Sequence, residues 1–391
     1  MGLKDTLLAA SIGATMVSCT NASGQNIQSD RPAEAPQSLH LSNPQTQEQQ
    51  FQQNYRYLYN HVSGAWFSFG DERTLRDCLH KIGSFPMGRE VIAGIPSNME
   101  FNSTNFMPDA TYRDANGAIK EDTYGGIYNW RRNELTINTA ILDSDSLYYS
   151  YRADLLFHEL LHAYQRHNGI MMLDNPSIEQ SLISQKVIEA EAAAWNDILQ
   201  ATQRVTDSHS IRMLPAEGPY HLTSQQVRDL MRRDLVAEER TFCHEAGIRF
   251  NATEFKKTDP VYRFQQALIA CRGDYSAAQR KMVGDRIRER MQEQDTPWAT
   301  AYNAQAIRST LELCRMGRVS KNGNNAAYNR MLRYYQNQYG VSPRDITNIN
   351  FNPRHREAID TIRSDMDKYN AYSDTQVRPA TQPSVRRDGG R

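Results

Sequence analysis

The sequence of 391 residues predicts an α+β fold that is mostly helical, with one small antiparallel sheet. Two observations support this prediction. Between Thr111 and Asn138, short runs with strand-forming residues flank turn-type sequences, which is typical of paired strands. From about Ser146 onward, apolar residues recur at helical spacing instead, and cap residues and glycines separate the segments. The strands therefore come early in the chain, and helices make up most of the remaining sequence.

The first 19 residues resemble a bacterial signal peptide that ends in a lipobox. Lys4 supplies the positively charged n-region of such a peptide. The apolar run Leu7–Val17 that follows is too short to span a bilayer. Met16–Cys19 resembles a lipobox, in which Cys19 becomes lipidated and forms the mature N-terminus. We therefore expect an exported protein, anchored by lipid at the bacterial cell envelope, with a secreted protein as the alternative. Gly2 also fits a loose N-myristoylation pattern.

Residues 20–53 are rich in Gln, Asn, Ser and Pro, and we expect them to form a disordered tether. Short amphipathic helices come next at Gln53–Tyr59 and Asp71–Ile82, and then a short segment at Arg89–Ile95. These helices open a domain that we expect to cover residues 54–220.

Two strand pairs are predicted in this domain. The turn-type sequence DANG at residues 114–117 separates the first pair, Thr111–Arg113 and Ala118–Lys120. The second pair is Gly126–Trp130 and Glu134–Asn138, separated by residues 131–133. In its second strand, apolar Leu135 and Ile137 alternate with polar neighbours, as in a half-buried strand.

Residues 221–372 form a helical region, and residues 373–391 a polar tail that we expect to be disordered. The predicted helices, separated by turn and cap residues, are Ser224–Ala246, Pro260–Arg272, Tyr275–Gln292, Pro297–Met316, Asn324–Gln338 and Pro353–Asp367.

The helix after the strands carries the motif HELLH at residues His158–His162. On a helix its two histidines lie about 40° apart and one turn from each other, so both imidazoles can bind one Zn²⁺ ion. Glu159 lies about 80° from the pair, close enough to take a proton from zinc-activated water as general base without being a ligand. Leu156 and Ala163 lie on an apolar face that anchors the helix, while the histidines face a cleft.

A catalytic zinc site needs a third protein ligand. The metzincin pattern HExxHxxGxxH would require Gly at position 165 and His at position 168, but the chain has Gln165 and Asn168 there. His167 is one residue out of register and is expected to be a solvated histidine at the helix end. The metzincin pattern is therefore excluded.

A glutamate on a following helix is the remaining choice, and residues 181–195 offer Glu189 and Glu191. Glu191 falls near the centre of the apolar face of this helix, where a carboxylate is costly unless a metal compensates its charge. We therefore predict Glu191 as the third ligand. Glu189, which points the other way, is the alternative. A buried glutamate paired with an arginine such as Arg152 is the interpretation without a metal.

HELLHAYQ followed by EAEAAA resembles gluzincin-type zinc metallopeptidases. More narrowly, it is similar to a loose group of bacterial metallopeptidases, secreted effector proteases among them, that show HELxHAxQ and then EAxA. KIGSFPMGR at residues 81–89 is similar to the lead-in of that group, and the resemblance covers about residues 75–199.

The resemblance implies a zincin-like core, a small antiparallel sheet plus active-site helices, within residues 54–220. His158, His162 and Glu191 or Glu189 would bind Zn²⁺, and Glu159 would be the general base of a metallopeptidase. The strand Glu134–Asn138 would pair with an extended peptide or protein substrate. A side chain that stabilises the oxyanion is also expected; the sequence leaves four choices open, Tyr128, Tyr164, His209 and His221.

The remaining features limit partners and rival functions. Charges balance at 45 basic and 45 acidic residues, so no nucleic-acid partner is expected. Membrane contact is expected only through the lipid anchor.

One rival function is a non-catalytic surface lipoprotein that binds a partner through its helical region, and another is a protease delivered into a host cell. Besides Cys19, four cysteines remain, which either form two disulfides or stay reduced and buried.

Overall fold

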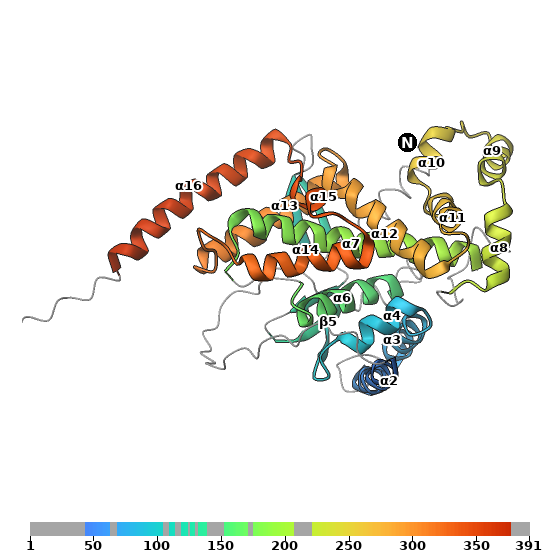
Figure 1. Ribbon diagram of the computed structural model, residues 1–391, viewed down its shortest axis with the longest axis horizontal. Coiled ribbons are helices and arrows are strands. Elements are labelled where there is room, and N and C mark those ends of the chain that lie inside the picture. Colours follow the sequence, from blue (N-terminus) through green and yellow to red (C-terminus); the bar gives the residue numbers. More distant parts are fainter. Residues whose placement is uncertain are drawn as a thin grey trace, which may run out of the picture.

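The computed structural model describes residues 44–62, 69–104, 109–113, 119–123, 126–129, 132–138, 152–170, 175–206 and 221–376. The predicted signal peptide, Cys19 and residues 377–391 of the expected tail lie outside this part of the chain. As predicted, the fold is α+β and mostly helical (Figure 1).

One long helix, α7 (Ile178–Thr206), runs through the middle of the molecule (Figure 1). It contacts α6 (Arg152–His167), which comes before it, and six helices that follow it in the chain, between residues 224 and 347. A helix with neighbours on all sides buries its polar residues as well as its apolar ones. Polar residues of α7 are therefore buried together with Trp195 and Ile198.

The chain enters the fold earlier than predicted. Helix α2 spans Pro44–His61, so the expected tether is wrong for residues 44–53. Phe51 is 5% exposed and belongs to the hydrophobic core. The buried side-chain amide of Asn54 donates to the backbone carbonyls of Ile92 and Ile95, at 2.9 and 3.0 Å. One apolar stripe and one buried amide are thus enough to fix a helix of otherwise polar composition.

Two further helices connect α2 to the sheet, α3 (Phe69–Ile82) and α4 (Pro86–Gly94). Phe85 caps the start of α4, and its ring lies 5.2 Å from that of Phe157 on α6 and 6.2 Å from that of Trp195 on α7. Phe157 and Trp195 are themselves 6.1 Å apart. This aromatic cluster fixes α6 against α7, the two helices that carry the predicted zinc ligands.

The predicted antiparallel sheet is in fact mixed. Strand β5 (Glu134–Asn138) lies between β4 (Gly126–Asn129), which is antiparallel to it, and β1 (Glu100–Thr104), which is parallel. The polar sequence EFNST of β1 shows no alternation, which is why the sequence did not predict this strand. A separate antiparallel pair joins β2 (Asp109–Arg113) to β3 (Ile119–Thr123), as predicted.

The position of β5 corrects one expectation about substrate. Because β1 and β4 occupy both of its edges, β5 has no edge on which to pair with an extended peptide. Leu135 and Ile137 are buried, as their alternation predicted. The sheet meets α6 through β4 and β5.

The helices of the C-terminal region agree closely with the sequence prediction, with two short additions, α10 and α15. They are α8 (Ser224–Arg232), α9 (Leu235–Glu245), α10 (Ala252–Thr258), α11 (Pro260–Ala270), α12 (Tyr275–Gln292), α13 (Pro297–Arg315), α14 (Asn325–Tyr339), α15 (Pro343–Thr347) and α16 (Pro353–Gln376). The predicted single helix Ser224–Ala246 is divided because the side chain of Asp234 accepts a hydrogen bond from the Ala237 amide and caps α9.

The larger of two hydrophobic clusters runs through the described chain from Phe51 to Ile346, and the smaller one packs Ile359 and Ile362 of the last helix against α7 and α13. Residues 54–220 and 221–372 therefore share a core, because α11 to α14 pack directly on α7. Helix α16 extends away from the body (Figure 1) and continues beyond the predicted boundary at residue 372.

Among the described residues, no helix combines the length and the apolar character needed to cross a bilayer. The four described cysteines, Cys78, Cys243, Cys271 and Cys314, are free thiols rather than disulfides.

Gly88 tests the close packing at the start of α4. A Cβ at this position would lie 1.9 Å from the carbonyl oxygen of Ile82 and 2.7 Å from the Phe85 ring. Gly88→Ala should therefore lower the free energy of unfolding by about 2–3 kcal/mol. At Gly317, φ is 65° and nothing lies within 4 Å of such a Cβ, so Gly317→Ala should cost only about 1–2 kcal/mol from backbone strain. Urea unfolding measures both, and equal losses would contradict the packing.

Candidate metal centre

The motif helix α6 forms as the sequence predicts and then ends in a left-handed cap. Gly169 has φ of 67°, and the Ile170 amide donates to the Gln165 carbonyl at 2.8 Å, which closes the last turn. His158, Glu159 and His162 are fully buried on this helix. His167 at its end is exposed, as expected.

Three side chains from α6 and α7 converge on one point. The two Nε2 atoms of His158 and His162 lie 3.0 Å apart. Oε2 of Glu189 lies 3.4 Å from the first of these atoms and 3.6 Å from the second. Within the described residues, His158, His162 and Glu189 are a buried group that could hold a metal ion.

The spacing of these atoms fits a metal of ordinary size. Four ligands at about 2.0–2.1 Å around a tetrahedral ion are separated from one another by about 3.3–3.4 Å. The observed separations of 3.0, 3.4 and 3.6 Å lie around that value. Oε2 of Glu189 makes no hydrogen bond of ordinary geometry, and its two imidazole neighbours lie at 3.4 and 3.6 Å. The donor set, two imidazoles and one carboxylate, thus has the geometry and the unsatisfied atom that an ion would complete.

The third residue of this group corrects the choice between the two glutamates. Glu191, the preferred third ligand, instead accepts hydrogen bonds from three neutral donors. The hydroxyl groups of Tyr334 and Tyr339 donate to its Oε1 at 2.8 and 2.5 Å. The side-chain amide of Gln165 donates to its Oε2 at 2.8 Å. Glu189, the alternative, is the carboxylate that meets the histidines.

The positions of Glu189 and Glu191 around the helix could not identify the third ligand, because α7 is buried on every side. The prediction treated the apolar face as the buried one, but Gln185, Glu189 and Asn196 on the opposite face are also at most 4% exposed. A buried carboxylate does need compensation. At Glu191 it comes from tyrosine hydroxyl groups of α14, a helix about 140 residues away in the sequence, rather than from a metal.

The charges of the three candidate ligands depend on one another. Burial alone would lower the pKa of His162, but the carboxylate of Glu189 outweighs it and raises the pKa to about 9. Burial would raise the pKa of Glu189, and the charge of His162 with the contacts of both histidines lowers it to about 2. Burial lowers the pKa of His158. Without a metal, His162 therefore holds the proton, His158 is neutral and Glu189 is ionised.

Glu159 is the unusual residue of the site. It is fully buried, and no described side chain hydrogen-bonds to its carboxylate; the backbone of Tyr128 on β4 is the one hydrogen-bond donor that acts on its pKa. Burial raises its pKa to about 8, although the charge of His162 opposes this shift. Gly126 on the neighbouring strand β4 lets it approach closely, since a Cβ there would lie 3.1 Å from Cγ of Glu159. A buried carboxyl with a strongly shifted pKa is characteristic of functional sites.

In the described part of the chain the histidine face is closed to solvent, which corrects the cleft that the sequence predicts. The side chains of His158, Glu159, His162 and Glu189 are all at most 2% exposed. Helix α13 also reaches the group, because Nε2 of Gln305 donates to Oε1 of Glu189 at 3.5 Å. The face is covered because α7 and α13 pack over it.

The side chains of the described choices for the oxyanion donor are engaged elsewhere, and Tyr128 acts on Glu159 through its backbone. The hydroxyl of Tyr164 donates to Glu90, and that of Tyr128 donates to Asn133. The ring of His221 packs against Tyr275. His209 lies outside the described residues.

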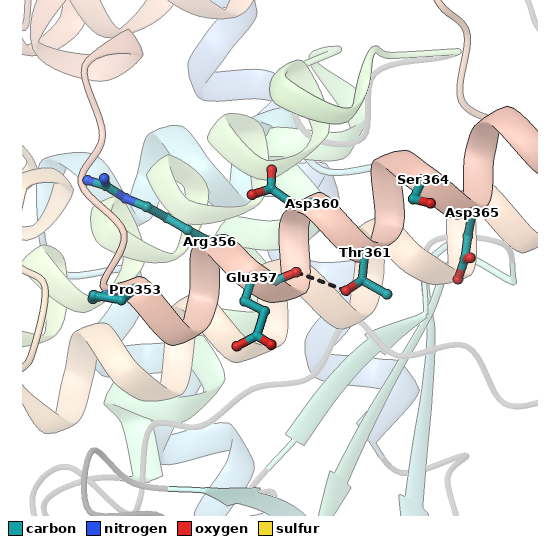
Figure 2. A pocket seen from close by; sticks show the side chains of 7 residues that line it. All are labelled: Pro353, Arg356, Glu357, Asp360, Thr361, Ser364 and Asp365. Atoms are coloured by element: carbon teal, nitrogen blue, oxygen red, sulfur yellow. Dashed lines mark hydrogen bonds between the residues drawn. The ribbon is translucent and has the colours of Figure 1, made fainter.

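A surface hollow elsewhere has no comparable chemistry. Figure 2 shows it along α16, and its lining residues among those described all belong to that helix: Pro353, Arg356, Glu357, Asp360, Thr361, Ser364 and Asp365. The one hydrogen bond drawn there joins the Thr361 hydroxyl to the Glu357 carbonyl within the helix. The candidate functional site is therefore the buried group between α6 and α7.

Comparison with protein-family models, with curated proteins and with solved structures finds no match for this chain.

The charge state of the group predicts how metal uptake depends on pH. A metal ion must displace the proton of His162, so binding of added Zn²⁺ at pH 7 should release at least one proton. Raising the pH removes this proton from the metal-free protein, so the apparent affinity should increase up to about pH 9. Calorimetric titration in buffers of different ionisation enthalpy measures the release. Zinc binding with no proton release would contradict this assignment.

Proposed function

We propose that this protein is a zinc-dependent metallopeptidase with a gluzincin-like zincin core. His158, His162 and Glu189 would hold the zinc ion, and Glu159 would act as general base. The observation that carries this proposal is the convergence of three ligand atoms next to the buried carboxyl of Glu159, to which no described side chain hydrogen-bonds. A peptide or protein is the proposed substrate.

The choice of Zn²⁺ rests on the donor set. Two imidazoles and one carboxylate are typical of catalytic zinc sites, which keep a fourth position for water or substrate. Harder ions such as Mg²⁺ and Ca²⁺ prefer sets made of oxygen atoms only. Bound Zn²⁺ would lower the pKa of water to about 7 and polarise a carbonyl group.

Glu159 supports hydrolysis over storage or structure. Burying a carboxyl that no side chain compensates is costly, so a site that merely binds an ion has no reason to keep one beside it. The charge of a bound Zn²⁺ ion would favour the ionised form of Glu159 against the burial that raises its pKa to about 8 in the metal-free protein, and as general base it would then take a proton from the attacking water and deliver it to the leaving amine. Strand β4 limits where its carboxyl lies, because Gly126 brings the backbone of that strand close to the Glu159 side chain.

Metal content and hydrolysis, measured on the same variants, test this function. Wild-type protein should hold about one zinc ion, Glu189→Ala should lose it, and Glu159→Gln should keep it. Glu159→Gln should hydrolyse a quenched fluorescent peptide library about 10²–10⁴-fold more slowly than wild type. Glu179→Gln is the matched control, since Glu179 lies on the same helix as Glu189 but on the surface. A fully active Glu159→Gln variant would rule out the proposed base.

A second candidate function is a structural metal site within a lipoprotein that binds a partner through its helical region. The complete burial of all three candidate ligands favours it, since structural zinc sites are closed. The same experiment separates the two functions. Stoichiometric zinc with no hydrolysis by wild type, together with a lower melting temperature of the metal-free protein, would support the structural site.

We also propose that the chain is exported and lipid-anchored through Cys19. The apolar run and the lipobox-like sequence in front of Cys19 support this placement. Mass spectrometry of the mature N-terminus should find an acylated Cys19, and Cys19→Ala should abolish membrane attachment. An acylated Gly2 would instead indicate a protease delivered into a host cell.

A further inference from the structure

A directed chain of hydrogen bonds leads from the core to one of the candidate ligands. It starts at Trp195, whose Nε1–H donates to the Tyr339 hydroxyl at 3.1 Å. Since this oxygen accepts from Trp195, its own hydrogen is free to point to Oε1 of Glu191, at 2.5 Å. The Tyr334 hydroxyl donates to the same oxygen. Oε1 of Glu191 therefore accepts hydrogen bonds from both tyrosine hydroxyl groups.

The other oxygen of Glu191 fixes the orientation of Gln165. Oε2 accepts the Gln165 amide N–H at 2.8 Å, since an ionised carboxylate can only accept; burial raises the pKa of Glu191, and the hydrogen bonds from Tyr339, Tyr334 and Gln165 oppose this shift. The amide oxygen of Gln165 then lies toward His162, 2.9 Å from Nδ1. Because this oxygen accepts, Nδ1 of His162 carries the hydrogen. Its Nε2, 3.0 Å from Nε2 of His158, keeps a lone pair for the metal in the neutral ring.

We infer that Glu191 is a positioning residue: through Gln165 it holds His162 in the Nδ1–H tautomer, which leaves Nε2 free to bind the metal. This inference rests on the metal site of the proposed function. Histidine ligands usually donate their second N–H directly to a carboxylate, a carbonyl or water, and loss of that partner weakens metal binding about 10–100-fold. Here an amide stands between the histidine and the carboxylate.

The direction of these hydrogen bonds can be reversed by a substitution. This property distinguishes the proposed role of Glu191 from a simple packing role. In Glu191→Gln the amide oxygen is favoured on the side of the two tyrosines, because both hydroxyl groups donate there and that of Tyr339 already accepts from Trp195; the new NH₂ group then faces Gln165. The Gln165 amide then has to turn over and present its own NH₂ to His162. Nδ1 becomes an acceptor, the hydrogen moves to Nε2, and the nitrogen that should bind the metal is blocked. An isosteric change of one atom is thus transmitted through two side chains.

Exchanging the two residues restores the direction of the chain. In the double variant Gln165→Glu/Glu191→Gln, the carboxylate at position 165 accepts both from the NH₂ group at position 191 and from Nδ1–H of His162. The double variant has the same atoms and the same charge as wild type. Tyr334→Phe is the matched control, because it removes one donor to Glu191 without reversing any other hydrogen bond.

Zinc affinity, measured by competition with a chelator, is the first readout. Glu191→Gln should bind Zn²⁺ about 10–100-fold more weakly than wild type. The double variant and Tyr334→Phe should both bind within about threefold of wild type. Wild-type affinity in Glu191→Gln, or no recovery in the double variant, would overturn the inference. Thermal unfolding of the metal-free variants shows whether any loss comes from misfolding.

The second readout needs neither metal nor activity. The imidazole ¹⁵N shifts of His162, recorded in metal-free protein above the pKa of about 9, distinguish the two tautomers. Wild type and the double variant should show Nδ1–H, and Glu191→Gln should show Nε2–H. The same tautomer in all three would overturn the inference. If wild type bound no zinc, the proposed function would fail while this readout still decided the role of Glu191.

Discussion

The site depends on a buried ion pair between two helices. Glu189 on α7 lies 3.4 Å from His158 and 3.6 Å from His162 on α6, with all three side chains closed off from water. Buried charges are stable only when they are paired or bind a metal. This pair therefore sets how α6 and α7 must pack, and the aromatic cluster of Phe85, Phe157 and Trp195 packs beside it to hold them there.

The C-terminal helices belong to the site rather than to a separate module. Helix α13 supplies Gln305, which contacts Glu189, and α14 supplies Tyr334 and Tyr339, which contact Glu191. Both glutamates lie on α7, which packs against both of these helices. The region after residue 221 therefore closes the candidate metal centre and surrounds it with hydrogen-bond donors. This arrangement explains why the two parts of the chain share one hydrophobic core.

Local signals predicted those parts of the fold that depend on neighbouring residues. Tyr275–Gln292 has a cap, a helical period and clear ends, and it forms the predicted helix, α12. The polar strand β1 pairs with β5 from more than 30 residues away, and no local pattern announces such a pairing. The start of α2 was missed because its polar composition hides one buried stripe around Phe51.

In the candidate site, too, the local signals were predictive and the contacts between distant residues were not. The histidines four residues apart are a local signal, and they converge as predicted. The choice between Glu189 and Glu191 depended on what surrounds α7, and only the fold shows that tyrosines of α14 satisfy Glu191. One sequence signal was overlooked. Gln165, whose presence excluded the metzincin pattern, lies three residues from His162, where a helix brings side chains together.

Anomalous diffraction from crystals grown with Zn²⁺ tests the central claim most directly. We predict one strong peak at the zinc edge, about 2.0–2.1 Å from Nε2 of His158, Nε2 of His162 and Oε2 of Glu189. Glu191 should remain in contact with Tyr334 and Tyr339. A peak coordinated by Glu191, or no peak between α6 and α7, would contradict the account.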